Sequence, residues 1–300
     1  MGRLCAGRVA IVTGGGRGLG REYALMLAEQ GAKVVVNDLG STAAGEGADL
    51  SPAQQVVDDI KRNGGEAIVN GNDVSDWAGA KALIDDAINT FGRLDVLINN
   101  AGILRDRMMV NMTEAEWDAV IKVHLKGTFA PSHHAAQYWR QEAKTRGAPV
   151  SARLINTSSA SGLFGNVGQS NYGAAKAGIA AFTIISATEL RQYGITVNAI
   201  APRAQTRMTE GLRERTEEEI KRRNPRWVAP IVVWLASEQS QDVTGRVFEA
   251  GDGILKVAEG WHAGPGIDPV EDPNELGPQV MELMRKARPN ADIWGRDIVS

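Results

Sequence analysis

The sequence predicts an α/β fold, a doubly wound parallel sheet of about seven strands with helices on both faces. Short runs of β-branched residues alternate with longer segments of helical periodicity, which is the pattern of parallel strands joined by helical crossovers. The first run, residues 8–13, has no polar alternation, as expected for a strand buried on both faces. A glycine-rich turn follows this run directly and leads into a helix.

The other elements follow in order from the same patterns. Apolar residues three and four apart predict a helix over 18–30, which Gly31 ends. The next predicted elements are strand 33–37, helix 53–63, strand 66–70, helix 76–91 and strand 94–98. Later strands are predicted at 153–158, 195–200 and 246–249. Residues 39–52 are small, polar and rich in glycine, so they are predicted to form a loop.

The predicted organisation is a single domain over residues 1–253 followed by an extension over 254–300. A nucleotide-binding α/β domain has about 250 residues, so roughly 50 residues of this chain are left over. Residues 260–278 are rich in proline and glycine, and an amphipathic helix is predicted near 279–288. Because the extension is too short and too broken to form its own core, we expect it to pack on the core or on a neighbouring subunit.

Composition disfavours several classes of function. The formal net charge is −3, whereas a nucleic-acid binder usually carries a basic face. No run of 18 apolar residues and no signal-peptide segment is present, so we expect no membrane association and a cytoplasmic location. Cys5 is the only cysteine, and the four histidines show no zinc-ligand spacing, so neither a disulfide nor a metal site is expected.

The glycine-rich turn predicts a phosphate-binding loop. Its glycines follow the pattern T-G-x-x-x-G-x-G, at Gly14, Gly18 and Gly20. Free N–H groups and the positive dipole end at the start of a helix bind anions, and glycine lets the backbone come close to them. Arg17 and Leu19 stand between these glycines and belong to the same candidate cofactor-binding loop.

Asp38 predicts which dinucleotide this loop binds. It follows strand 33–37, about 20 residues beyond the glycine turn, where a carboxylate accepts hydrogen bonds from the adenosine ribose hydroxyls and repels a 2′-phosphate. Arg17 favours the opposite choice, because a basic residue in the loop can hold a 2′-phosphate. We predict NAD as the cofactor, since a carboxylate beside a dianionic phosphate is hard to compensate.

Three further residues predict the catalytic group. Tyr172 and Lys176 are four residues apart, so they share one face of a helix. A phenol has a pKa near 10 and must fall by roughly 3 units to act as a base near neutral pH. An adjacent ammonium and an oxidised nicotinamide, both positive, can lower this pKa. Ser159 ends the strand predicted at 153–158, on the sheet edge where cofactors bind.

These motifs together resemble the short-chain dehydrogenase/reductase family, which has a Rossmann-type fold. The resemblance covers about residues 6–253. It implies that Tyr172 is the general acid/base, that Lys176 lowers the pKa of the tyrosine and binds the nicotinamide ribose, and that Ser159 hydrogen-bonds the substrate oxygen. It also implies cofactor contacts for residues outside the glycine loop, namely Asp73 and Val74 at the adenine, Asn100, Ala101 and Gly102 on the ribose side, and Pro202 and Thr206.

Longer segments are similar to one branch of this family, the (3R)-hydroxyacyl-CoA dehydrogenase module of peroxisomal multifunctional enzyme type 2, also called 17β-hydroxysteroid dehydrogenase type 4. The similar segments are residues 36–40, 100–107, 123–127, 157–162, 165–169 and 227–230. Bacterial stand-alone relatives of that module are thought to serve fatty-acyl or sterol side-chain β-oxidation. No hydratase or sterol-carrier module follows in these 300 residues, and on this resemblance we expect an enzyme like the stand-alone relatives.

Two positions depart from the pattern of the wider family. The wider family usually has an asparagine that holds a proton-relay water at the position of His124. The type 2 branch has a histidine there, as this sequence does. A relay or structural role near the site and a plain packed histidine are both open. Arg203 replaces the glycine that usually follows the proline of the sixth strand. It either meets a phosphate of coenzyme A or is solvated.

The leading hypothesis is the NAD-dependent oxidation of a secondary alcohol, either a 3-hydroxyacyl-CoA or a 17β-hydroxysteroid. One alternative is a 3-oxoacyl reductase of lipid synthesis, which Asp38 disfavours because such reductases generally use NADPH. Another is a non-catalytic dinucleotide-sensing protein, which the complete set of Ser159, Tyr172 and Lys176 disfavours. Family members are commonly oligomeric, so the resemblance implies a homodimer or homotetramer with a small-molecule substrate.

Overall fold

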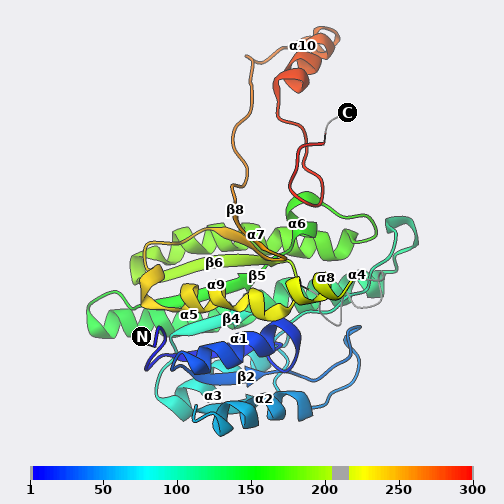
Figure 1. Ribbon diagram of the computed structural model, residues 1–300. Helices are drawn as coiled ribbons and strands as arrows, with labels where there is room; N and C mark the ends of the chain where they lie inside the picture. The colour runs from blue at the N-terminus through cyan, green and yellow to red at the C-terminus, as the bar shows by residue number, and fades with distance from the viewer. Residues whose placement is uncertain (1–2, 205–215, 299–300) are drawn as a thin grey trace.

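The structure is a computed structural model that describes residues 3–204 and 216–298 (Figure 1). Within these residues an eight-stranded sheet has the order β3-β2-β1-β4-β5-β6-β7-β8. Neighbouring strands are parallel except for β8, which runs antiparallel to β7. The strands are β1 (Val9–Thr13), β2 (Lys33–Asn37), β3 (Ala67–Asn70), β4 (Val96–Asn99), β5 (Ala152–Thr157), β6 (Ile195–Pro202), β7 (Val247–Gly251) and β8 (Ile254–Ala258). The predicted class is confirmed, with one strand more than expected.

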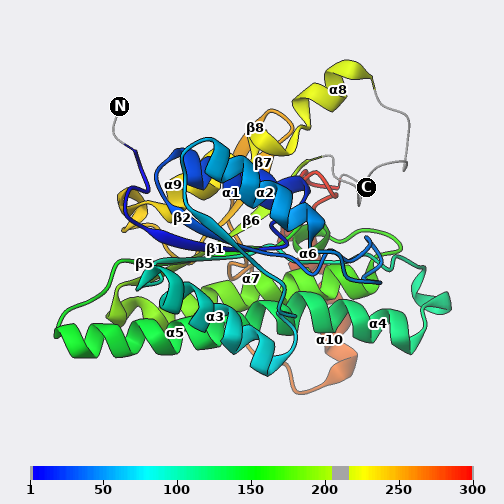
Figure 2. The same cartoon turned by 90° about the horizontal axis from the view of Figure 1, so that it is seen from below.

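Helices cover both faces of the sheet (Figure 2). Helices α1, α2 and α9 pack on one face, whereas α3, α5 and α7 pack on the other. The helices of the described segments are α1 (Gly18–Glu29), α2 (Ser51–Arg62), α3 (Trp77–Phe91), α4 (Glu114–Ile121), α5 (Gly127–Arg146), α6 (Ala160–Phe164), α7 (Ser170–Leu190), α8 (Glu217–Arg222), α9 (Ala229–Ala236) and α10 (Pro273–Lys286). The three helices predicted at 18–30, 53–63 and 76–91 correspond to α1, α2 and α3.

Alternate residues of β1 point into different layers, which explains why this strand has no polar position. Ala10 and Val12 pack with the helices of one face, and Val9 and Ile11 pack with those of the other. All four side chains are buried. Burial of apolar surface on both faces is the main force that holds this layered arrangement together.

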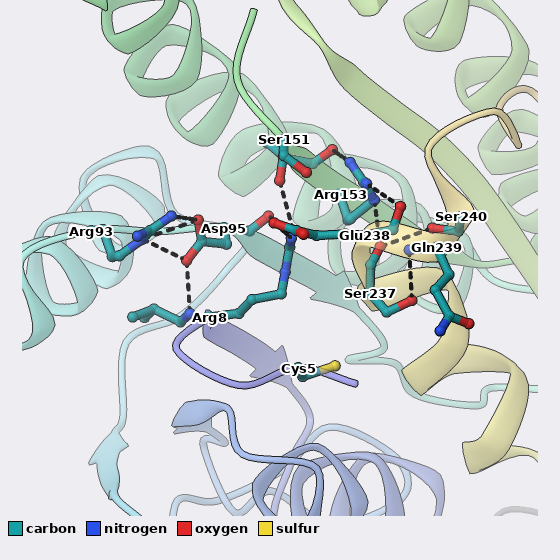
Figure 3. A network of polar contacts seen from close by, with 12 residues as sticks. Cys5, Arg8, Arg93, Asp95, Ser151, Arg153, Ser237, Glu238, Gln239 and Ser240 are labelled. Atoms are coloured by element: carbon teal, nitrogen blue, oxygen red, sulfur yellow. Dashed lines mark hydrogen bonds and ion pairs between the residues drawn. The ribbon is translucent and has the colours of Figure 1, made fainter. Parts of the chain in front are cut away.

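A polar network closes the edge of the sheet at which the parallel strands begin (Figure 3). Arg8, just before β1, donates a 2.6 Å hydrogen bond to the carbonyl of Ser151, just before β5. Asp95, just before β4, accepts three hydrogen bonds from the guanidinium of Arg93. The buried Arg153 of β5 donates to the carbonyl of the residue that follows α9. These charges tie three strands and one helix together on the side away from the glycine turn.

The extension contributes to the sheet before it leaves the domain. Residues 254–258 form β8, so the sheet continues five residues beyond the predicted boundary at Gly253. The following segment is exposed, and α10 projects from the core without a buried residue (Figure 1). The chain then returns, and Trp294 lies against the guanidinium of Arg203, with 5.1 Å between the guanidinium carbon and the ring centroid.

Candidate active site

A cavity of about 580 Å³ lies at the edge of the sheet where β1, β4, β5 and β6 end. It brings together almost every site residue predicted from the sequence. These are Gly14, Arg17, Gly18, Leu19, Asp38, Asp73, Val74, Asn100, Ala101, Gly102, Ser159, Tyr172, Lys176 and Pro202. Gly20 does not line the cavity, and Thr206 lies outside the described residues.

The glycine loop is packed too closely against the first turn of α1 for a side chain at position 20. A Cβ atom on Gly20 would lie 2.1 Å from the carbonyl oxygen of Gly14, so only glycine allows α1 to begin against the end of β1. Gly20 therefore shapes the loop from behind, and Gly14 and Gly18 face the cavity. The start of α1 carries no side-chain cap, which leaves its first N–H groups free to bind a phosphate.

Thr13 and Asn100 hold this loop against the end of β4. The hydroxyl oxygen of Thr13 accepts hydrogen bonds from the backbone N–H groups of Asn100 and Ala101, at 2.9 and 3.0 Å. The amide of Asn100 donates in return to the carbonyl oxygens of Thr13 and Gly14. Thr13 was not among the predicted site residues, although its position directly before the first glycine was the available signal.

Asp38 joins the glycine loop to the turn after β2. One carboxylate oxygen accepts a 2.8 Å hydrogen bond from the N–H of Gly16, and the other accepts a 2.7 Å bond from the N–H of Gly40. The carboxylate lines the cavity beside Arg17, whose guanidinium is 3.5 Å from the carbonyl oxygen of Ser41. Since each carboxylate oxygen can accept more than one hydrogen bond, Asp38 retains capacity for ribose hydroxyls.

Asp73 and Val74 form the wall of the cavity after β3. The carboxylate of Asp73 accepts hydrogen bonds from both the backbone N–H and the hydroxyl of Ser75, which fixes the turn. Val74 is buried and packs against the start of α5 at Gly127. The wall at this end is thus half apolar, as a pocket for a flat base requires. These features and the glycine loop fit a dinucleotide.

Helix α7 positions the predicted catalytic pair. The side chain of Asn171 accepts a hydrogen bond from the N–H of Tyr172 and donates to the carbonyl oxygens of Arg105 and Glu116. This anchors the start of α7 to the segments that border the cavity. The ammonium of Lys176 lies 5.5 Å from the centroid of the Tyr172 ring, so the spacing of four residues places both groups on one face, as predicted.

The pKa values of this pair are shifted by burial. Burial raises the pKa of Tyr172 to about 12, although a hydrogen bond with Ser159 opposes the rise. Burial lowers the pKa of Lys176 to about 7. The surroundings within the protein therefore keep Tyr172 protonated, and a fall in its pKa requires additional positive charge from a bound nicotinamide.

His124 is buried and packs edge-on against the ring of Tyr172, with 5.1 Å between the ring centroids. Its Nε2 atom lies 3.1 Å from the backbone nitrogen and 2.7 Å from the carbonyl oxygen of Ile103. A Cβ atom on Gly102 would lie 2.3 Å from the imidazole, so this contact requires glycine. Burial lowers the pKa of His124 to about 3, and the ring is neutral at physiological pH.

Arg203 is neither solvated nor free. Its guanidinium is buried and forms an ion pair with the buried carboxylate of Glu249 in β7. The neighbouring residues Pro202 and Ala204 line the cavity, whereas Arg203 points away from it. This pair could not be predicted from the sequence, because its two members are 46 residues apart and the pairing of β6 with β7 brings them together.

A row of hydrogen-bonded side chains, Ser161, Gln169 and Asp106, borders the cavity. Gln169 donates a 2.7 Å hydrogen bond to the carboxylate of Asp106 and accepts one from the hydroxyl of Ser161. These residues lie beside Ser159, whose hydroxyl oxygen accepts from the N–H of Ser161. No sequence motif marked Gln169 or Asp106 individually, although both fall within the segments that carry the resemblance.

In the part of the chain that the structure describes, no helix is long and apolar enough to cross a membrane. The same residues contain no group of three or more histidine, cysteine, aspartate or glutamate side chains arranged to hold a metal ion.

The fold and the cavity define an α/β oxidoreductase that binds a nicotinamide dinucleotide at the ends of its parallel strands. A family model described as short chain dehydrogenase matches residues 8–218. The chain belongs to the short-chain dehydrogenase family.

Two relatives and one solved structure are similar over most of the chain. The peroxisomal multifunctional enzyme type 2 of Drosophila melanogaster is 43% identical over 293 residues, which cover 96% of the chain and 44% of that protein. A hydroxyacyl-CoA dehydrogenase of Mycobacterium tuberculosis is 45% identical over 252 residues, 81% of the chain and 77% of the relative. The crystal structure of a short chain dehydrogenase from Mycobacterium avium matches with a TM-score of 0.86 and 52% identity, covering 96% of the chain and 98% of the other. The match spans 44% of the length of this Drosophila relative, so the chain covers less than half of that multifunctional protein.

Proposed function

We propose that the protein oxidises a 3-hydroxyacyl-CoA to the 3-oxoacyl-CoA with NAD⁺. The observation that carries this proposal is the meeting of Ser159, Tyr172 and Lys176 in one cavity with the glycine loop and Asp38. A cavity of this size accepts a dinucleotide's nicotinamide end and a small reacting group together. The relatives whose names include hydroxyacyl-CoA dehydrogenase or multifunctional enzyme type 2 support an acyl-CoA substrate.

The chain's own residues supply proton transfer and orientation. Tyr172 takes the proton of the substrate hydroxyl as general base. Ser159 donates a hydrogen bond to the same oxygen and stabilises the charge that develops on it. A bound oxidised nicotinamide supplies the hydride acceptor and a positive charge. Lys176 is held by a 2.6 Å hydrogen bond to the carbonyl of Thr157. In its protonated form it adds positive charge near the tyrosine, and in either form it supplies a donor for the cofactor ribose.

Selectivity for NAD⁺ over NADP⁺ rests on Asp38. The two backbone N–H groups that hold its carboxylate fix it beside the loop, where an adenosine ribose would meet it. A 2′-phosphate at this place would face a fixed negative charge in a partly buried site, which costs more than the same charge in water. The same argument disfavours an NADPH-dependent 3-oxoacyl reductase.

The extension reaches a neighbouring subunit in this proposal, and the working unit is a homodimer or homotetramer. The apolar side chains of α10 support this, because Met281 and Met284 are largely exposed on a helix that projects from the core. An amphipathic helix without its own core normally buries such a face on another surface.

The substrate proposal is tested by comparing kcat/KM for a medium-chain 3R-hydroxyacyl-CoA, its 3S isomer and a 17β-hydroxysteroid, all with NAD⁺. The expected result is that one of the acyl-CoA isomers is preferred over the steroid by at least about tenfold, a difference of ~1.4 kcal/mol in transition-state binding. A preference for the steroid, or turnover only in the reductive direction with NADPH, would contradict the proposal.

A further inference from the structure

A second cavity, of about 340 Å³, lies on the other side of the end of β6 from the candidate active site. Its walls come from the end of β6, helix α8, the hairpin of β7 and β8, and the returning segment of the extension. We call it the basic cavity, because most of the described residues that line it are cationic. The lining residues are Arg203, Glu219, Arg222, Arg223, Asp252, Ile254, Lys256, Trp294 and Arg296.

The positive charges of the basic cavity exceed the carboxylates that pair with them in the described chain. Five cations line it, at Arg203, Arg222, Arg223, Lys256 and Arg296. The carboxylates that line it or pair with these cations are four, namely Glu219, Glu249, Asp252 and Asp292. Among the described residues, the cations at this cavity therefore outnumber the carboxylates by one.

The cations are held in place by the fold. Glu249 of β7 is the direct cross-strand partner of Lys256 in β8, so their side chains lie on the same face of the sheet. Glu249 also holds the guanidinium of Arg203. A single carboxylate thus stands between two cations, and within the described residues Lys256 has no ion pair of its own.

Asp252 plays a similar role on the other wall. Its two oxygens lie 2.6 Å from Arg222 and 3.4 Å from Arg223, the two arginines at the end of α8. The indole of Trp294 also lines the cavity, lies against the guanidinium of Arg203, and is about half exposed. A flat aromatic ring beside several cations is the combination that binds a purine nucleotide through stacking and phosphate contacts.

The position of the basic cavity relates it to the substrate. Pro202 and Ala204 line the candidate active site, and Arg203 between them lines the basic cavity. Among the described residues, the end of β6 therefore borders both cavities. A substrate whose reacting carbon is at Tyr172, and whose other end is a nucleotide on a long flexible arm, can reach both.

We propose that the basic cavity binds the phosphate-bearing adenosine end of coenzyme A in the acyl-CoA substrate. This inference rests on the proposed function and goes beyond it, because it assigns a separate subsite for the carrier. The phosphates contact the cations of Lys256, Arg222 and Arg296, and the adenine lies near Trp294. The subsite contributes binding energy to the acyl-CoA and no chemistry, so it affects KM and leaves kcat unchanged.

The test compares two substrates that share the same 3-hydroxyacyl group. One is the coenzyme A ester, and the other is the N-acetylcysteamine thioester, which lacks the phosphates and the adenosine. In the double variant Lys256→Gln/Arg296→Gln, KM for the coenzyme A ester should rise by about tenfold or more, because two charge-assisted contacts are lost. The kcat with this ester, and kcat/KM with the truncated ester, should stay within about twofold.

The control variant is Lys81→Gln, in which an exposed lysine of α3 is changed outside both cavities. It should leave KM for both esters unchanged. If the double variant raises KM for both esters equally, or for neither, the subsite assignment is wrong although the proposed function stands. If the wild-type protein oxidises neither ester, the proposed function fails and the subsite assignment fails with it.

Adenosine 3′,5′-bisphosphate distinguishes a carrier subsite from a site for a free nucleotide. It should inhibit the wild-type protein competitively against the coenzyme A ester and weakly against the truncated ester. The double variant should lose this inhibition. Inhibition that is non-competitive against the coenzyme A ester would mean that the basic cavity binds a free nucleotide, which would overturn the proposal.

Discussion

The ammonium group of Lys176 donates a 2.6 Å hydrogen bond to the backbone carbonyl of Thr157, at the end of β5. This bond joins α7 to the end of β5, two residues before Ser159, so one contact between a helix and a strand ties the helix of the base to the segment that leads to the serine. Lys176 is almost fully buried, and the cost of burying its charge lowers the pKa to about 7.

The buried lysine makes stability depend on pH. In the unfolded chain Lys176 keeps its proton up to its usual pKa of 10.5, whereas in the folded protein it loses the proton near pH 7. The unfolded state therefore binds more protons across this window, and stability rises with pH by up to about 1.4 kcal/mol per unit. We expect urea unfolding at pH 7, 8 and 9 to show this rise, and Lys176→Met to reduce it. An identical slope in both proteins would contradict the buried-lysine account, and Lys81→Met is the exposed control.

Asp38 is expected to decide between the two dinucleotides. The substitution Asp38→Asn keeps the shape of the side chain and removes its charge, so the repulsion of a 2′-phosphate is lost. We expect kcat/KM with NAD⁺ to fall by about tenfold, because the ribose then meets a neutral acceptor, and the ratio of NAD⁺ to NADP⁺ activity to fall further. Initial rates with both cofactors measure this. An unchanged ratio would show that the carboxylate does not set the preference.

The polar network at the opposite edge is expected to contribute to stability and not to activity. In Asp95→Asn, Arg93 loses its paired carboxylate and the buried Arg8 and Arg153 lose a nearby negative charge. Removal of one partner of a buried charge network costs about 3 kcal/mol, which urea unfolding at pH 7 can measure. The exposed pair of Lys81 and Asp85 provides the control, since Asp85→Asn should cost less than about 1 kcal/mol. Equal losses in both variants would refute a structural role for the network.

Two truncations separate the parts of the extension. A chain that ends at Gly253 lacks β8 and exposes the edge of β7, so its thermal midpoint should fall. A chain that ends at Glu259 keeps all eight strands, so its thermal midpoint should stay close to that of the full-length protein. Its particle mass in light scattering should nevertheless fall if α10 joins subunits. The same midpoint for both truncations would mean that β8 contributes nothing, and unchanged mass would remove α10 from the interface.

Much of the fold could be predicted because a parallel sheet has a simple pattern. The seven parallel strands were predicted within one or two residues, since each is a short apolar run between helices. β8 was missed because Ile254–Ala258 is an edge strand with a half-exposed surface, and it follows two glycines inside a segment rich in glycine and proline. Inner strands are recognisable in a sequence because their burial on both faces gives a continuous apolar run, and edge strands lack this burial.

The site was predictable where chemistry depends on neighbours in the chain and not where it depends on distant contacts. Tyr172 and Lys176 lie on one helix, so their spacing predicted that they share a face, and the other motifs of the resemblance gave that pair its predicted role. Other contacts depend on how elements distant in the sequence pack together. These are the ion pair of Arg203 with Glu249 and the hydrogen bond that Asp38 accepts from Gly16. The direction of the pKa shift of Tyr172 also depends on burial, which spacing does not report.

The most direct test of the proposed mechanism is the rate of NAD⁺ reduction by Tyr172→Phe with the preferred 3-hydroxyacyl-CoA. Phenylalanine keeps the ring that packs on His124 and removes only the hydroxyl, so binding of NADH, followed by its fluorescence, should be retained. We expect kcat to fall by about a thousandfold, which is the contribution of a positioned general base. A rate equal to that of the wild-type protein, with NADH binding intact, would contradict the assignment of Tyr172 as the catalytic base.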